Sequence, residues 1–216
     1  MVEGTSDVAY MEIAARLYRT ATGRELLSQD FSVFAAGNGD EGGTYGVSER
    51  FPSLFDLASL ELDAGGNRRY RVIALLDDDP MGRMATAGIA RSNRGIVEYE
   101  SIFRLRRVLP LRAGSAKALA EKTKLANSSY GTLECTIEDL LPDSLCDQFI
   151  KTAPQSICKP PLKAGSRVHR FWTLPGKQGL LRFVSQQATI EDAEGIINAL
   201  RALRSYVGLA PDGATP

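Results

Sequence analysis

The chain has 216 residues, of which 44% are hydrophobic and 24% are charged, as is typical of a globular protein with one sizeable core and at most a small appended subdomain. Its 26 basic and 26 acidic residues balance, which excludes a strongly basic nucleic-acid coat protein. No apolar run approaches the ~18 residues that span a bilayer, and no basic segment followed by an apolar one opens the chain. A membrane or secretory role therefore has no support.

The first predicted element is an amphipathic helix that follows Ser6 as its N-cap and stops at Gly23. Four residues recur there at helical spacing: Val8, Met11, Ala15 and Tyr18. Glu3 would lie in the turn before this helix and Asp7 in its first turn. Only two residues precede Glu3, whereas a strand that leads into such a turn has about five. We therefore expect a fragment, a misplaced start, or a first strand completed by another segment.

A second strand is predicted at residues 31–36, and a glycine-rich loop follows it at residues 37–43. The loop contains the string G-x-G-x-x-G, which raises the alternative of a dinucleotide site. The context argues against that site, because residues 44–63 have no clean helical start and the glycines do not follow the first strand. The sequence also has no G-x-x-x-x-G-K-[ST] string. We predict a tight, mobile loop and no ATP hydrolysis by this chain alone.

The centre of the chain combines a buried strand with a run of acids. Residues 72–76 are continuously apolar, which favours a strand buried on both faces of a parallel sheet. Asp77, Asp78 and Asp79 follow directly, and a helix is predicted from Gly82 to Ala90. Acids crowded at the carboxyl edge of a parallel sheet need a cation or a partner, and ligands bind at that edge. An EF-hand is excluded, because residues 81 and 88 offer no ligands.

The remaining elements are predicted from periodicity and from turn residues. They are a strand over 95–105 with a kink near Glu100, a helix over 113–127, a helix over 133–150 interrupted at Pro142, irregular structure over 151–179 around a short strand at 168–173, and a last helix that begins at a capping box from Thr189 to Asp192 and stops at Gly208.

The cysteines and the histidine limit the choice of metal and compartment. Cys135, Cys146 and Cys158 are odd in number and never spaced as Cys-x-x-Cys, which favours a reducing cytoplasm. His169 is the only histidine, so a zinc site with several His or Cys ligands is not expected. Any metal should therefore be a hard cation held by oxygen.

Two acidic motifs, Glu3-Gly4-x-x-Asp7 and Asp77-x-Asp79-x-x-Gly82, together resemble the TOPRIM fold of topoisomerases, primases, small maturation ribonucleases and OLD-type (overcoming lysogenization defect) nucleases. The resemblance covers residues 1–111, and Leu-Leu-Asp-Asp-Asp-Pro-Met-Gly-Arg is its most specific string. In that family the glutamate is a general acid or base or a metal ligand, and the Asp-x-Asp pair holds magnesium. By position these residues are Glu3, Asp77 and Asp79. Asp78 should point away from the site, since strand residues alternate faces.

The rest of the chain is most similar to the OLD-type nucleases. The segment with Glu134, Glu138 and Asp139 resembles their acidic helix, which completes a second metal site, with Glu138 the first choice and Glu134 the second. The segment that follows Gly176 resembles the one that contains their catalytic lysine, here Lys177. Asp7 fits their second acid in the first motif. Topoisomerases and primases would need further domains.

The resemblance implies an α/β TOPRIM core, Rossmann-like with a mostly parallel sheet flanked by helices, over 1–111. A mainly helical extension over 112–208 would complete the active site, and 209–216 would form a flexible tail. The implied function is hydrolysis or nicking of DNA by two Mg²⁺ or Mn²⁺ ions. Implied partners are DNA and a separate ATPase subunit or missing N-terminal domain. By analogy the resemblance also implies a role in phage defence, and it allows a homodimer. We expect Arg83, Arg104 and Arg106 to contact DNA phosphates.

Several alternatives stay open from the sequence alone. A non-catalytic TOPRIM module that binds DNA or a partner, and a TOPRIM ribonuclease that acts on structured RNA, both fit the acidic motifs. The aspartates could be turn formers, the later acids a solvated helix face, and Lys177 an ordinary surface lysine. The arginines could form a solubilising surface, and His169, beside two aromatic residues, is interpreted as structural.

Overall fold

A computed structural model describes residues 1–37, 42–131, 133–165 and 167–213. These residues form a mixed α/β structure with seven α-helices, three short 3-10 helices and two small two-stranded sheets. The α-helices are α1 (Thr5–Thr22), α2 (Gly43–Leu60), α3 (Pro80–Ser92), α4 (Ala116–Ala126), α5 (Asp143–Thr152), α6 (Leu174–Gln187) and α7 (Glu194–Tyr206). The strands are β1 (Ala74–Leu76), β2 (Ile102–Arg104), β3 (Ile157–Ala164) and β4 (Arg167–Trp172), and the 3-10 helices are η2 (Ser128–Tyr130), η3 (Ile137–Leu140) and η4 (Pro154–Ser156).

The centre of the molecule is a set of parallel extended segments. β1 and β2 form a parallel pair with Leu75 opposite Phe103. Val2 makes single parallel bridges to Leu75 on one side and Ala35 on the other. The order across the centre is therefore the segment at Ala35, the chain start, β1 and β2. The amino group of Met1 donates to the Ile73 carbonyl at 2.7 Å, and burial lowers its pKa to about 5.

This centre is smaller than the extended, mostly parallel sheet that we expected. Within the described residues only β1 and β2 form a parallel ladder, and the two segments beside β1 contribute one bridge each. The strand predicted at 31–36 is wrong: Ala35 bridges to Val2, but the residues around it are irregular.

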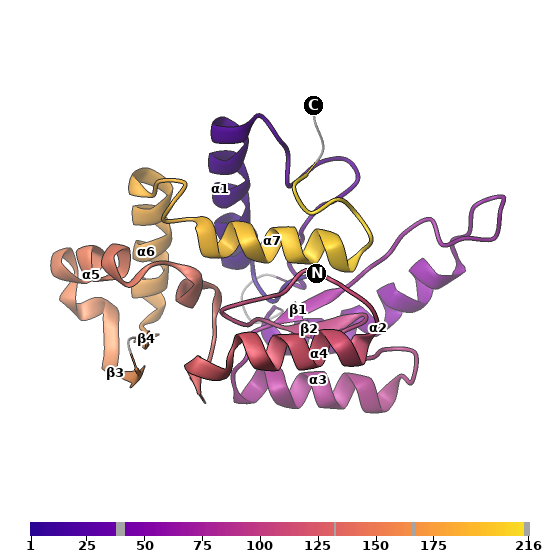
Figure 1. Cartoon of the computed structure of the whole chain (residues 1–216). Coiled ribbons are helices and arrows are strands. Elements are labelled where there is room, and N and C mark those ends of the chain that lie inside the picture. Colours follow the sequence, from indigo (N-terminus) through magenta and orange to yellow (C-terminus); the bar gives the residue numbers. More distant parts are fainter. Residues whose placement is uncertain (38–41, 132, 166, 214–216) are drawn as a thin grey trace.

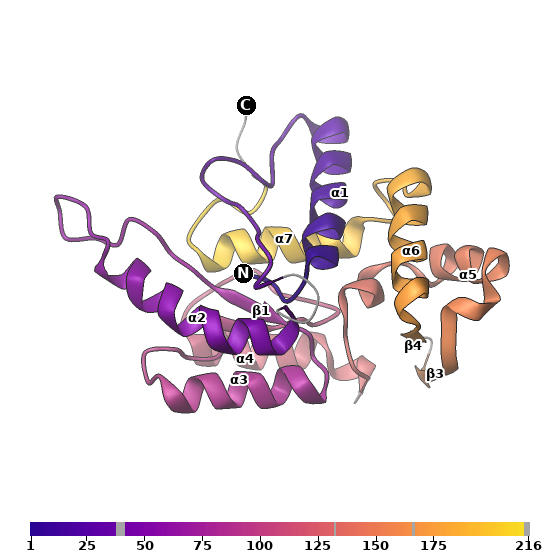
Figure 2. The same ribbon diagram turned by 180° about the vertical axis from the view of Figure 1, so that it is seen from behind.

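Helices cover both faces of the parallel centre (Figures 1 and 2). Ala74 and Leu76 point into a small cluster with α2 and α3, while Leu75 points into the larger cluster with α1 and α7. On β2, Phe103 stacks on Tyr206 of α7, with ring centroids 4.4 Å apart. This alternation is what a strand buried on both faces requires, and it explains the continuously apolar sequence of β1.

Four predicted helices are confirmed with small changes at their ends, and one of them is the helix predicted over 113–127, which is α4. α1 ends at Gly23, which adopts φ 71°, but its N-cap is Gly4 rather than Ser6. α3 begins directly after Asp79. The capping box of Thr189 and Asp192 forms, although the α-helix itself starts only at Glu194.

Other segments differ from the prediction. α2 forms where the sequence has no clean helical start, with Gly42 as N-cap and Pro52 inside the helix. The strand predicted at 168–173 is confirmed as β4. The residues before it, which were expected to be irregular, form β3 and pair with β4 in an antiparallel hairpin, with pairing irregularities around Pro160 and Pro161. Prolines are tolerated there because β3 is an edge strand. The helix expected before Pro142 is only the 3-10 helix η3.

The N-terminal and C-terminal parts of the chain share one hydrophobic core. Its largest cluster joins Met11 and Leu75 to Leu141, Leu180 and Leu200. The described part of the predicted tail contacts the protein, since the Arg204 Nε donates to the carbonyl of residue 210 at 2.9 Å. No α-helix in the described ranges is long and apolar enough to cross a membrane.

Candidate active site

Acidic side chains meet at the carboxyl ends of the central parallel segments. Glu3 follows the bridge at Val2, and Asp77 follows β1. The Glu3 Oε1 accepts a hydrogen bond from the backbone N–H of Asp77 at 2.9 Å, although 74 positions separate the two residues. The structure thus brings the two sequence motifs together, because parallel segments end at the same edge.

Asp7 lies in the first turn of α1 and faces the same region. Its Oδ2 accepts a hydrogen bond from the Gly4 N–H at 2.9 Å, which caps the helix. Burial raises the pKa of Asp7 to about 6, and the charge of Glu138 adds to this effect. Asp7 is therefore both a helix cap and a member of the acidic group.

Glu138 and Lys177 complete the group from the C-terminal half of the chain. Glu138 lies in η3 and is only 2% exposed. Its carboxylate accepts a hydrogen bond from Thr136 Oγ1 at 2.7 Å and lies 3.3 Å from the Lys177 Nζ. Lys177 belongs to the first turn of α6, whose N-cap is Thr173. We call Glu3, Asp7, Asp77, Glu138 and Lys177 the acidic cluster.

The acidic cluster has more negative than positive charge, and its pKa values reflect this. Burial, followed by the charges of Asp7 and Asp79, raises the pKa of Glu3 to about 7. Burial and the charges of Asp7, Glu3 and Glu138 raise the pKa of Asp77 well above its usual value. Burial disfavours the charged form of Lys177, but the neighbouring carboxylates outweigh it and its pKa is raised. Glu138 is buried and the other three acids are half-buried. A single lysine does not neutralise four such acids, so the cluster favours a further cation.

Asp79 lies at the edge of the acidic cluster and has a structural task as well. Its Oδ1 accepts a hydrogen bond from the Gly82 N–H at 2.7 Å and so caps α3. Gly82 is packed against the chain, because a Cβ at this position would lie 2.0 Å from the Asp77 carbonyl oxygen. The turn from β1 into α3 is therefore fixed by the same residues that form the acidic motif.

The donor set suits a hard divalent cation, but the side chains are not arranged as a finished metal site. Carboxylate oxygens are the ligands that Mg²⁺ and Mn²⁺ prefer. In the described part of the chain, no three His, Cys, Asp or Glu side chains are grouped closely enough to hold a metal ion. Three of the carboxylates instead have local donors, which are the Asp77 N–H for Glu3, the Gly4 N–H for Asp7 and Lys177 for Glu138. A metal would have to draw these side chains inward by rotation of their torsion angles.

Asp78 points to a different group of side chains, as we predicted from the alternation of a strand. It is 2% exposed, and its carboxylate pairs with Arg83 at 3.4 Å, with Arg104 at 2.9 Å and with Arg106. Arg104 also pairs with Glu98 at 2.7 Å. The three arginines expected to contact DNA thus surround one buried carboxylate. Arg83, with 42% of its side chain exposed, is the most accessible of them.

Glu134 does not join the acidic cluster. Its Oε2 lies 3.7 Å from the Nε2 of His169, whose Nδ1 lies 2.7 Å from Asp139. Asp139 also pairs with Arg107 at 3.0 Å. Of the acids expected in this segment, the structure therefore places only Glu138 beside Lys177. His169 is buried within this second group, where it links β4 to η3.

Two residues near the acidic cluster were not predicted. Thr136 donates to Glu138, as described above, and also forms the capping box of η3 with Asp139. Tyr10 lies one turn after Asp7 on α1, and its buried hydroxyl has no hydrogen-bond partner in the described residues. Burial raises the pKa of Tyr10, and the charges of Glu138 and Asp7 contribute. Tyr10 follows Asp7 by three residues, and this spacing in the sequence would have placed it on the same face of the helix.

The glycine-rich loop adjoins the acidic cluster at the ends that are described. The Gly43 N–H donates to the Glu3 carbonyl at 3.0 Å, and Gly43 adopts φ 64°. Residues 38–41, on which most of the G-x-G-x-x-G string falls, lie outside the described residues. The predicted mobile loop therefore stays a prediction.

Comparison of the chain with known protein families, with curated proteins and with solved structures finds no match.

Proposed function

We propose that this protein is a TOPRIM-type nuclease that hydrolyses DNA phosphodiesters with Mg²⁺ or Mn²⁺. The observation that supports the proposal best is the meeting of Glu3, Asp7, Asp77, Glu138 and Lys177 at the carboxyl edge of the parallel centre. These residues come from four separate parts of the sequence. Acids that raise each other's pKa values lower the stability of the folded protein, and such destabilising clusters are typical of functional sites.

The proposed roles follow from position. Glu3, Asp77 and Asp79 would hold one ion, and Asp7 and Glu138 would contribute to a second. When bound, two such ions activate the attacking water and stabilise the leaving oxygen of a phosphodiester. Glu3, with a pKa of about 7 before metal binds, is suited to accept or return a proton near neutral pH.

Lys177 is proposed to act on the substrate. It is a cation beside the acids, and 38% of its side chain is exposed, so it can reach a phosphate while it remains near Glu138. A phosphate oxygen would compete with the Glu138 carboxylate for the ammonium group. Substrate binding would thereby free Glu138 for a metal, which links the two events.

The arginines around Asp78 are proposed to position the DNA backbone. Three guanidinium groups against the carboxylates of Asp78 and Glu98 leave an excess of one positive charge next to the acidic cluster. Arg83 is the residue that can reach furthest, because it is the most exposed. Contacts of this kind give affinity with little sequence readout.

The proposal is tested by incubating the protein with supercoiled plasmid in Mg²⁺, Mn²⁺ or EDTA. We expect metal-dependent nicking that Asp79→Ala and Lys177→Ala abolish and that Glu121→Gln, an exposed change on α4, preserves. Nicking that survives Asp79→Ala would refute the assignment. Metal-dependent cleavage of structured RNA but not plasmid would favour the ribonuclease, and binding without cleavage would favour a non-catalytic module. An ATPase partner and a homodimer stay predictions that rest on the resemblance.

A further inference from the structure

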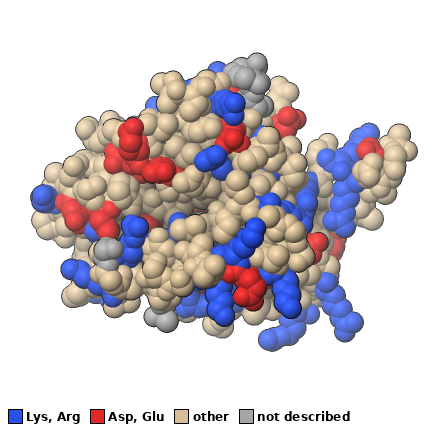
Figure 3. All heavy atoms as spheres, viewed as in Figure 1, with Lys and Arg blue, Asp and Glu red and all other residues tan. Residues whose placement is uncertain are grey.

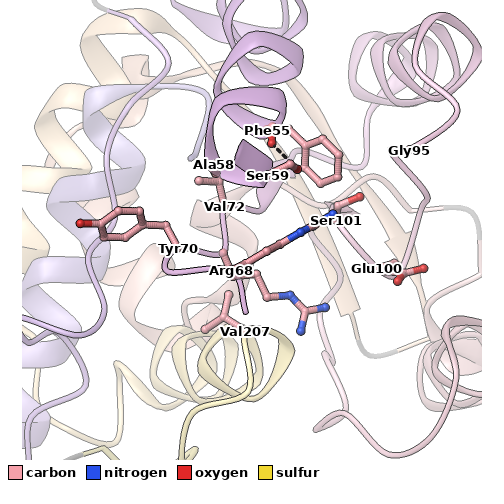
Figure 4. A pocket seen from close by; sticks show the side chains of 11 residues that line it. Phe55, Ala58, Ser59, Arg68, Tyr70, Val72, Gly95, Glu100, Ser101 and Val207 are labelled. Carbon is pink, nitrogen blue, oxygen red and sulfur yellow. Dashed lines mark hydrogen bonds between the residues drawn. The ribbon is translucent and has the colours of Figure 1, made fainter. Parts of the chain in front are cut away.

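A hollow lies at the amino end of β1, at the opposite end of the strand from the acidic cluster. One cavity of about 500 Å³ is formed between α2, the segment before β1 and the turn at residues 95–101 (Figure 4). Another of about 510 Å³ lies against the same segment. The two cavities share five lining residues, which are Arg68, Tyr70, Arg71, Val72 and Val207. Sites for small molecules typically have volumes of about 300–1,000 Å³.

The walls of these cavities have unbalanced positive charge. Burial lowers the pKa of Arg71, and the nearby guanidinium groups of Arg112 and Arg68 lower it further, while Glu100 opposes them. No carboxylate within the described residues forms an ion pair with Arg68, Arg69 or Arg71. The segment that contains them projects from the body between α2 and β1, with basic side chains along its stem (Figures 1 and 3). An anion would relieve this repulsion.

The same cavities have aromatic and apolar walls. The Arg68 guanidinium lies over the Phe55 ring, 5.7 Å from its centroid. Tyr70 lines both cavities and is 61% exposed, and its ring points away from Phe55 (Figure 4). Val72 and Val207 form further apolar lining. Flat rings bind between aromatic faces and guanidinium planes, and the planar guanidinium fork matches phosphate oxygens.

We propose that this hollow binds a nucleotide unit, with its phosphate on Arg68 and Arg71 and its base against the exposed ring of Tyr70. The nucleotide is either free or part of a nucleic-acid chain, because both offer the same phosphate and base. The proposal does not depend on the nuclease activity, since β1 separates the hollow from Asp77. The guanidinium groups of Arg68 and Arg71 would bind the phosphate, and the aromatic ring would stack on the base.

Calorimetric titration in EDTA tests the proposal without any cleavage. The probes are AMP, inorganic phosphate and a short oligothymidylate. The variant Arg68→Ala/Arg71→Ala removes both guanidinium groups that would bind the phosphate. The control Arg16→Ala/Arg91→Ala removes two exposed arginines from α1 and α3. We expect the first variant to weaken binding of AMP or of the oligonucleotide by about tenfold or more, and the control to bind within about twofold of the wild type.

The arms of the titration separate the two sources of the nucleotide. Binding of AMP points to a free nucleotide. Binding of the oligonucleotide by a protein that does not bind AMP points to nucleic acid. Either result supports the site if the binding is lost in Arg68→Ala/Arg71→Ala. Binding that is unchanged in this variant, or equally weakened in the control, would overturn the proposal. So would inorganic phosphate that binds as tightly as AMP, or no binding by any probe. Asp79→Ala should bind the probes like the wild type, whether or not it cuts DNA.

Discussion

Replacing Glu3 by Gln should stabilise the metal-free protein at alkaline pH. Burial and the charges of Asp7 and Asp79 raise the pKa of Glu3 from 4.5 to about 7. At about 1.4 kcal/mol per pKa unit, the ionised carboxylate costs the folded state at most about 3.5 kcal/mol, and screening by solvent lowers this cost to about 1–2 kcal/mol. Gln removes the charge but keeps an oxygen that can accept the hydrogen bond from the Asp77 N–H.

The sign of the pH dependence follows from linkage. The folded state binds the Glu3 proton more tightly than the unfolded state, so the stability that this proton contributes is fully present below about pH 4.5 and is lost as pH rises through about 7. The variant has no such proton at position 3. Its advantage over the wild type should therefore be absent near pH 4.5 and complete above about pH 8.

Urea unfolding in EDTA at these two pH values measures the difference in free energy of unfolding. The matched control is Glu12→Gln, an exposed change on the same helix as Asp7, which should stay within about 0.5 kcal/mol of the wild type. A loss of stability in Glu3→Gln at alkaline pH would refute the electrostatic reasoning. So would a gain of equal size at both pH values, because a change in packing alone does not titrate.

Three other outcomes are expected. Asp78→Asn should lower the free energy of unfolding by about 3 kcal/mol or more, because three arginines would lose their shared buried carboxylate; a change below about 0.5 kcal/mol in urea unfolding would contradict this. Gly82→Ala should lower the melting temperature and the nicking rate, because its Cβ would meet the Asp77 carbonyl oxygen at 2.0 Å. Its control is Gly88→Ala on the same helix, whose Cβ meets nothing within 4 Å, so the melting temperature should stay the same or rise. Millimolar Mg²⁺ should raise the melting temperature, by the equivalent of about 2.7 kcal/mol at a hundred times the dissociation constant, and no shift would count against the metal site.

Local patterns in the sequence were sufficient for features that depend on neighbouring residues. A helix after Asp79 was predicted from small residues that follow a buried strand, and α3 begins there with Asp79 as its cap. The alternation of a strand predicted that Asp78 would point away from its neighbours, and it does. Hydrogen bonds and side-chain directions over a few residues follow from local chemistry, so the sequence reveals them.

Features that depend on pairing between strands far apart in the sequence could not be predicted in the same way. Residues 157–164 contain prolines that suggested irregular structure, yet they form β3, because β4 supplies them with backbone partners. Conversely, residues 31–36 have strand-forming composition but make only isolated bridges, from Phe31 to Ser28 and from Ala35 to Val2. Strand formation depends on which segment lies alongside, and composition does not specify that segment.

The sequence by itself determined that Glu3 and Asp77 could meet, because each follows a segment of the kind that ends at the same edge of a parallel sheet. Only the tertiary structure decided between Glu138 and Glu134, which are four residues apart. The short turn of η3 directs Glu138 to Lys177, while Glu134 lies beside His169. The choice depends on where α6 and β4 pack against η3, and that packing comes from the shared hydrophobic core rather than from the acidic segment itself.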